Sequence, residues 1–106
     1  MQLIRWQNPE PPQESDLRTR MQQQGLDPYS WSNGPHYHYS AHSHSYQKVL
    51  YCVRGTIRFT LPDELDASGQ PTHIDLNPGD CMILPRNTRH SALVGPNGVT
   101  CIEAPQ

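Results

Sequence analysis

The sequence predicts one all-β domain, built as a sandwich or barrel of short strands. Its 106 residues suffice for a single domain that buries roughly two-thirds of the surface its unfolded chain would expose. Eleven prolines and seven glycines interrupt the chain too often for long helices and are typical of strands joined by turns. Between these breaks lie segments rich in β-branched and apolar residues, which a disordered chain would lack: residues 49–53, 56–61, 81–84 and 99–102.

A short helix is predicted near the N-terminus, after a short arm and a proline-rich linker. Ser15 is the expected N-cap, the helix runs to about Gln24, and Gly25 is the left-handed residue that ends it. Leu17 and Met21 share one face of this helix. One apolar pair leaves such a helix marginal on its own, so we expect it to pack against the sheet.

Strands and turns are predicted over the rest of the chain. Ile57, Phe59 and Leu61 alternate with polar residues, which indicates a strand with one buried face. A polar hairpin loop is expected over residues 62–71, and the turn at residues 95–98 is expected to separate the last two strands. We divide the single domain into an N-terminal arm, helix and linker packed on the barrel, residues 1–34, and the barrel itself, residues 35–106.

The charge and cysteine content exclude several classes of protein. The formal net charge is −2, with no basic cluster, so no nucleic-acid partner is expected. No basic start followed by an apolar run is present, and no segment approaches a membrane span, so we expect a cytoplasmic protein with no membrane partner. Cys52, Cys81 and Cys101 are odd in number and lie within apolar strand patterns, which argues against a disulfide framework.

Three histidines have the spacing of metal ligands. His42 and His44 are separated by one residue, so on an extended strand both side chains project to the same side. Residues 79–90 supply a turn, a short apolar strand, a second turn and His90. Neutral imidazole suits several transition metals, and three such ligands leave coordination positions open. We therefore predict a metal site formed by His42, His44 and His90.

Two further histidines allow a second register. His36 and His38 also have even numbers, so an unbroken strand would point all four imidazoles to one face. We favour His42 and His44 as ligands, because only they stand at the distance from Gly55, the residue expected to close the hairpin, that the family resemblance described next implies. His36 and His38 are then surface residues or lie near the rim of a pocket.

These residues resemble the two sequence motifs of the cupins, in particular the small single-domain cupins. The first motif is HxH, three residues, an acid, six residues and a glycine, and His42, His44 and Gly55 keep this spacing. The second is a glycine, five residues, Pro-x-Gly, two residues and a histidine, which Gly79 and His90 match. The resemblance covers roughly residues 34–103 and implies a cupin jelly-roll barrel with one short N-terminal helix.

The sequence departs from the cupin pattern at two positions. Asn87 replaces a glycine, which is a mild change because asparagine tolerates the left-handed backbone of a tight turn. Lys48 replaces the metal-binding glutamate. An ammonium about 5 Å from a divalent ion, at an effective dielectric constant near 20, is repelled by roughly 6 to 7 kcal/mol, or about five pKa units.

Four arrangements would relieve this repulsion. Lys48 is neutral and ligates the metal or acts as a base; it bends away to pair with a carboxylate; an anion at the metal offsets its charge; or no metal binds and Lys48 holds an anionic ligand itself. If it points inward with His42 and His44, as strand parity requires in the absence of a bulge, it is the candidate catalytic residue.

The resemblance implies a divalent transition metal such as iron, zinc, nickel or manganese, and a small-molecule ligand. Without the glutamate the site is similar to the three-histidine cupins, among which thiol and diketone dioxygenases use iron. Two classes of function stay open: a metal-dependent enzyme, dioxygenase-like or isomerase-like, and a non-catalytic small-ligand-binding module. The candidate pocket residues are His36, His38, Gln47, Cys52 and Phe59.

The strand over residues 49–53 is apolar on both faces. Such a strand is packed on two sides, either within the chain or by another subunit. We therefore predict a homodimer formed sheet to sheet, as the resemblance to cupins also implies.

Overall fold

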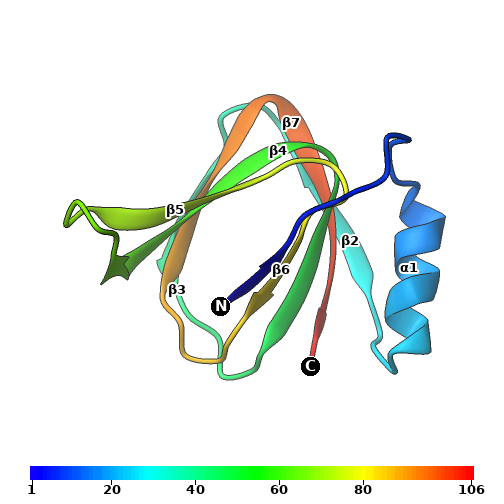
Figure 1. Cartoon of the computed structure of the whole chain (residues 1–106), viewed down its shortest axis with the longest axis horizontal. Helices are drawn as coiled ribbons and strands as arrows, with labels where there is room; N and C mark the ends of the chain where they lie inside the picture. Colours follow the sequence, from blue (N-terminus) through cyan, green and yellow to red (C-terminus); the bar gives the residue numbers. More distant parts are fainter.

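The computed structural model describes residues 1–106 and consists of seven strands and one helix (Figure 1). The elements in chain order are β1 (Gln2–Ile4), α1 (Glu14–Gln23), β2 (Tyr29–Asn33), β3 (His38–His42), β4 (Lys48–Leu65), β5 (Pro71–Leu76), β6 (Cys81–Leu84) and β7 (His90–Pro105). All strand pairs are antiparallel, in the order β1-β6-β4-β7-β2, with β3 paired to β7 and β5 paired to β4. The predicted all-β jelly-roll barrel with one short helix is confirmed.

Two long strands form the wall that connects the two ends of the barrel. β4 and β7 pair from Lys48 opposite Pro105 to Thr60 opposite Ser91. Each was expected as shorter pieces, and the turn predicted at residues 95–98 is instead a bend within β7, around which the register shifts. In Figure 1, the hairpin of β4 and β5 extends beyond the barrel.

The sequence suggested that Gly55 closes a hairpin. It lies instead within β4. Its φ is +77°, and a Cβ atom built there would lie 2.0 Å from the carbonyl oxygen of Gly98 on β7. Only glycine fits both the left-handed backbone and this close approach. The glycine of the first motif therefore lets the two long strands cross closely at their bends.

The side chains that point into the barrel form its main core. Along β4 these include Leu50, Cys52, Ile57, Phe59 and Leu61, all buried. The predicted alternation is thus confirmed, and Lys48, at the start of the same strand, shares the inward parity of Leu50 and Cys52.

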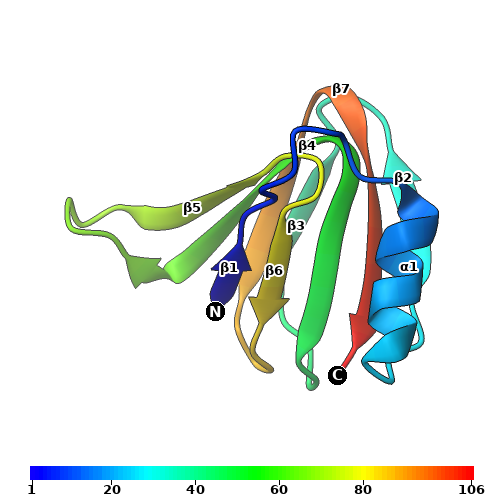
Figure 2. The same ribbon diagram turned by 45° about the vertical axis from the view of Figure 1, so that its right-hand side comes forward.

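The helix covers the outer face of β4 and β7 (Figure 2). Leu17 and Met21 are fully buried there against a second cluster of outward-facing residues: Val49, Tyr51, Val53, Cys81, Ile102 and Ala104. Gly25 ends the helix with a φ of +79°, as predicted. The N-cap prediction is wrong, because the cap is Gln13, which makes no side-chain capping bond, and Ser15 lies inside the helix.

The segment before residue 34, expected to pack on the barrel, also contributes two strands to its sheet. β1 pairs with β6 and β2 pairs with β7, so both belong to the barrel sheet. Only the linker and α1 are packed on the outside.

The apolar outer face of residues 49–53, which predicted a homodimer, is covered by the chain's own helix. The homodimer itself stays a prediction. The structure contains no helix that is long and apolar enough to cross a membrane.

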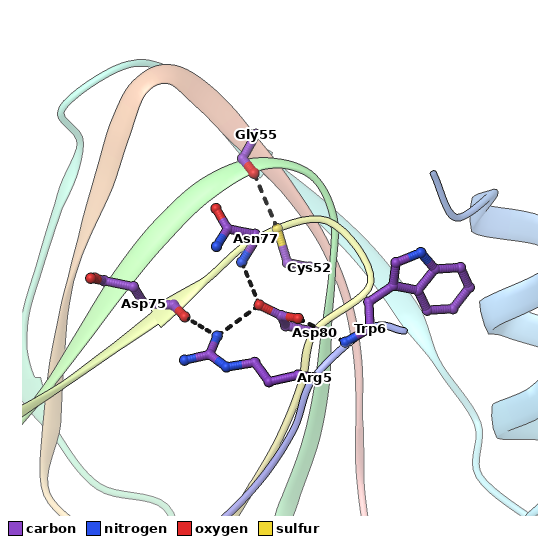
Figure 3. A network of polar contacts seen from close by, with 7 residues as sticks. All are labelled: Arg5, Trp6, Cys52, Gly55, Asp75, Asn77 and Asp80. Carbon is purple, nitrogen blue, oxygen red and sulfur yellow. Dashed lines mark hydrogen bonds and ion pairs between the residues drawn. The ribbon is translucent and has the colours of Figure 1, made fainter. Parts of the chain in front are cut away.

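A polar network holds the N-terminal segment at the turn between β5 and β6 (Figure 3). The buried carboxylate of Asp80 accepts hydrogen bonds from the backbone N–H groups of Trp6 (3.0 Å) and Asn77 (2.9 Å) and from Arg5 Nη1 (2.7 Å). Arg5 also donates to the carbonyl oxygen of Asp75. Burial alone would raise the pKa of Asp80, but these donors together outweigh it and lower that pKa.

Candidate metal centre

The three histidines of the predicted triad come together at one end of the barrel. His42 ends β3, His90 begins β7, and the two are directly opposite each other in the sheet. His44 lies in the loop before β4, where its carbonyl oxygen accepts a hydrogen bond from the backbone N–H of Asn87 (2.7 Å). Asn87 has a φ of 62°, so the asparagine adopts the left-handed conformation expected in place of the motif's glycine. In Figure 1, this is the lower end of the barrel, where β3 meets the start of β7.

The ring nitrogens are arranged for a shared ligand. The ligand atoms of His42, His44 and His90 all lie within 4.8 Å of one another. Nδ1 of His42 is 2.7 Å from the carbonyl oxygen of Ser40, and Nδ1 of His90 is 2.9 Å from that of Thr88. A carbonyl only accepts, so each Nδ1 carries the proton and each Nε2 keeps its lone pair.

Two of the Nε2 atoms are buried without a hydrogen-bond partner, those of His44 and His90. An orphaned buried polar atom is rare in folded proteins and calls for an explanation such as an ion. Desolvation, together with the nearby Lys48 charge, lowers the pKa of both rings, to about 4 for His90, despite the opposing effect of the Thr88 hydrogen bond. These imidazoles are therefore neutral at pH 7, which is the form that ligates metals.

The donor set fits a divalent transition metal. Three imidazoles, two of them with the tautomer fixed by a backbone carbonyl oxygen, are ligands that such an ion commonly uses. The three histidines differ in solvent exposure: His42 is exposed, His44 is half-buried and His90 is buried. Phe59 packs 6.2 Å from the His90 ring, and Tyr46 stacks 5.1 Å from the His44 ring, between ring centroids. A bound ion would therefore face solvent on the His42 side.

Lys48 forms a buried ion pair with Glu103, which sequence reasoning did not single out. Lys48 Nζ is 3.4 Å from Glu103 Oε2, with both side chains less than 10% exposed. Trp31 Nε1 donates to Glu103 Oε1, and the Tyr29 hydroxyl donates to Oε2 at 3.0 Å. Of the four arrangements considered for Lys48, this corresponds to pairing with a carboxylate. Desolvation and the adjacent Glu103 raise the pKa of Tyr29 to about 12.

The parity of β7 could have revealed Glu103. Val99 and Cys101 belong to the interior core, and Glu103 follows at the same two-residue period. Identifying Lys48 as the partner of Glu103, however, required the strand register, which places Glu103 opposite Leu50, two residues from Lys48. A carboxylate at the end of an apolar strand otherwise suggests an ordinary exposed terminus.

The other predicted pocket residues do not join the triad. His36 and His38 are exposed. His36 lies before β3 with a φ of 64°, and the register of β3 shifts between Tyr39 and His42, so the four histidines do not share the expected face. Gln47 bonds to Gln106 through both side chain and backbone.

Two predicted pocket residues are buried in the interior core. Cys52 is fully buried and its Sγ donates to the carbonyl oxygens of Arg54 and Gly55. Phe59 belongs to this core, and its ring packs against the ring of His90. All three cysteines are free and buried, as expected.

Comparison with known proteins assigns the chain to a family. Residues 26–94 match the family model described as a cupin domain. The chain is a cupin. No curated protein matches its sequence, whereas many solved structures share its fold.

Three structures illustrate the range of similar proteins. An oxalate decarboxylase from Bacillus subtilis is 21% identical with a TM-score of 0.64, covering 76% of this cupin and 21% of that chain. The Drosophila melanogaster CENP-C cupin domain is 15% identical with a TM-score of 0.64, covering 74% and 59%. A cupin-2 domain protein from Shewanella frigidimarina is 16% identical with a TM-score of 0.58, covering 76% and 71%. This cupin thus spans about a fifth of the decarboxylase, and the likeness concerns the fold alone.

Proposed function

We propose that this cupin binds one divalent transition metal through the Nε2 atoms of His42, His44 and His90. The observation that carries the proposal is the pair of buried, unpartnered Nε2 atoms on His44 and His90 beside the third ring. Iron, zinc, nickel and manganese all accept imidazole. The Bacillus subtilis oxalate decarboxylase has Mn(II) centres, which supports including manganese.

We further propose that the metal-bound form is an enzyme acting on a small molecule, of a dioxygenase-like or isomerase-like kind. Three protein ligands leave positions open for a substrate, and the exposed side at His42 provides access. The metal would act as a Lewis acid or redox centre, while Lys48 supplies a fixed positive charge beside it. The ion pair with Glu103 supports this role for Lys48 over that of a free base.

A second candidate is a binding module without chemistry. Lys48, the one candidate catalytic residue, is already paired. Drosophila melanogaster CENP-C, which has a similar fold, forms a complex with CAL1. A small-ligand-binding role would use the same metal and the same pocket without turnover.

The metal content of the purified protein tests whether the three histidines bind an ion. Purified chain loaded with Co²⁺ or Zn²⁺ and gel-filtered is expected to hold one ion, measured by plasma mass spectrometry. His42→Ala is expected to lower the metal affinity by 10-fold or more, because it removes one of three ligands while leaving the core intact. The matched control is His38→Ala, an exposed histidine on the same strand that should keep full occupancy. Equal losses in both variants would refute the triad.

Turnover separates the enzyme from the binding module. Iron-loaded protein is tested for oxygen consumption with a panel of thiols and diketones, alongside isomerisation of small sugars and keto acids. Turnover that depends on iron and is lost in Lys48→Met supports the enzyme. Full metal occupancy without turnover on any substrate supports the binding module.

A further inference from the structure

A cavity of about 290 Å³ lies on the outer face of the barrel, between the N-terminal arm, α1 and strands β4 and β6. Tyr51 and Cys81 line it from the sheet, where they are directly opposite each other and buried in the cluster that the helix covers. Two arginines also line it, Arg5 from the arm and Arg20 from α1, and no acidic residue does. The three histidines of the triad do not belong to it, so this cavity is separate from the metal site that we propose.

The two arginines differ in how their positive charge is balanced. Arg5 Nη1 pairs with the buried carboxylate of Asp80 at 2.7 Å, and the rest of its guanidinium keeps free donors. Arg20 takes part in none of the five ion pairs of the chain, although Asp16 lies one helical turn before it. The cavity therefore carries an uncompensated positive charge in a chain whose formal net charge is −2, and a concave positive site attracts anions.

Trp6 positions the guanidinium of Arg20. The guanidinium carbon is 5.9 Å from the centroid of the Trp6 ring, which points towards α1 in Figure 3. The ring is itself fixed, because its Nε1 donates to the carbonyl oxygen of Glu10 at 2.9 Å. It also packs against Gly79, where a Cβ atom would lie 2.3 Å from Cγ of the ring. Side chains that are fixed before a ligand arrives lose less entropy when it binds.

The other polar groups of the cavity are neutral, and they include hydrogen-bond donors. Burial raises the pKa of Tyr51, an effect that the neighbouring Arg20 opposes only in part, so its hydroxyl stays protonated at neutral pH. The side-chain oxygen of Asn8 accepts the backbone N–H of Glu10 at 3.0 Å, which leaves its NH₂ group free to donate. Burial also raises the pKa of Cys81 to about 11, so its thiol adds no negative charge.

We propose that this cavity binds a phosphate group, carried by inorganic phosphate or by a small phosphomonoester. The planar fork of Arg20 matches two phosphate oxygens. A tetrahedral phosphate then has acceptors left for donors such as Tyr51 and Asn8, whereas a carboxylate has only two oxygens in one plane. The volume is at the lower end of the ~300–1,000 Å³ that is usual for ligand sites, so the rest of the ligand is limited to a few atoms.

The test is a titration of protein that has been treated with a chelator and gel-filtered, so that no metal at the triad attracts the anion. The probes are inorganic phosphate, glycerol 3-phosphate and acetate at constant ionic strength and pH. Calorimetry of the unmodified chain is expected to show one phosphate per chain, bound at least 10-fold more tightly than acetate. Trp6 fluorescence, recorded in Trp31→Phe so that Trp6 is the only tryptophan, should change with the same affinity. Whichever phosphate probe binds more tightly identifies the source of the group.

Variants test the assigned donors. Arg20→Gln is expected to weaken phosphate binding at least 10-fold, and Arg20→Lys less, because it keeps the charge and loses the fork. Tyr51→Phe removes the hydroxyl but keeps the buried ring, and should weaken binding about 3-fold or more. The matched control is Arg54→Gln, which also removes an exposed arginine without an ion pair and should change the affinity less than 2-fold. Arg20 is exposed, so Arg20→Gln should remain folded, which denaturant unfolding checks.

Three results would overturn the proposal: no saturable phosphate binding, equal affinities for phosphate and acetate, or equal losses in Arg20→Gln and Arg54→Gln. His42→Ala should bind phosphate as the unmodified chain does, and a loss in that variant would place the anion at the triad and overturn the proposal as well. Arg20→Gln should keep full Co²⁺ occupancy, so the phosphate site and the metal site succeed or fail separately.

Discussion

The two ends of this barrel differ in whether their buried polar groups have hydrogen-bond partners. At the turn between β5 and β6, Asp80 receives three hydrogen-bond donors, two of them backbone N–H groups. At the other end, the Nε2 atoms of His44 and His90 are buried with no partner. Buried polar atoms without partners are costly. The comparison indicates that the Asp80 end serves stability, whereas the triad end agrees with the metal site that we propose.

The largest expected effect is at the Asp80 end. Asp80→Ala leaves Arg5 and the N–H groups of Trp6 and Asn77 without their acceptor, so the free energy of unfolding should fall by about 3 kcal/mol or more. Denaturant unfolding measures this. Asp63→Ala, which breaks the fully exposed pair with Arg89, is the control and should have little effect. Equal losses of unfolding free energy in the two variants would contradict the structural role assigned to Asp80.

The pH dependence of stability should differ between the ends. In metal-free protein, the pKa of His90 is lowered to about 4 from an unfolded value near 6.5, so the unfolded chain takes up the proton first. Stability is then complete above pH 6.5 and falls by about 2 to 3 kcal/mol as the pH drops towards 4. The contribution of Asp80, whose pKa is lowered, persists in this window and is lost only below about pH 4.

Urea unfolding of chelator-treated protein at several pH values checks this difference. His90→Gln should reduce the dependence between pH 6.5 and 4 to the smaller part contributed by His44, because it removes the imidazole whose pKa is lowered most. A profile that is flat in the unmodified protein and steep only below pH 4 would contradict the contrast.

Metal should stabilise the triad end without involving the other. At a free Zn²⁺ concentration 100 times the dissociation constant, the stability should rise by about 2.7 kcal/mol. The same increment is expected in Asp80→Ala, because distant sites add independently. Thermal unfolding with and without Zn²⁺ measures both increments. A difference above about 0.5 kcal/mol between them would show that the ends are coupled.

The smallest expected effect comes from Tyr29. Tyr29→Phe removes one donor from Glu103 but leaves Trp31 and Lys48 in place, and Tyr29 is half exposed. The free energy of unfolding should fall by less than about 1 kcal/mol, with unchanged Zn²⁺ occupancy. Trp31→Phe is the comparison variant and should cost more, because Trp31 is less exposed and packs on the core.

Sequence reasoning succeeded where fixed periods and spacings determine the geometry. The motif spacing brought His42, His44 and His90 together, although His44 lies in the loop after β3 and not on the extended strand that was expected. It failed where the decisive contact depends on long-range register. Glu103 reaches Lys48 only through the pairing of β4 with β7, and Arg5 reaches Asp80 across 75 positions of the chain.

The local failures have separate physical causes. The common face expected for His36, His38, His42 and His44 was broken by the irregularity in β3. The capping rule misplaced the helix start, because the helix is held by packing and needs no side-chain cap. The bend of β7 at residues 95–98 also carried turn residues that ordinarily end a strand.

The two-sided use of β4 makes this cupin intolerant of changes in chain length at one place. Lys48, Leu50 and Cys52 face the interior, while Val49, Tyr51 and Val53 face the helix. A single residue inserted after Lys48 would exchange these two sets, sending apolar side chains of different shape into each layer and moving the lysine out of step with its strand. Insertions and deletions should therefore accumulate in the loop between β4 and β5, whereas the interval from His44 to Gly55 should keep a constant number of residues.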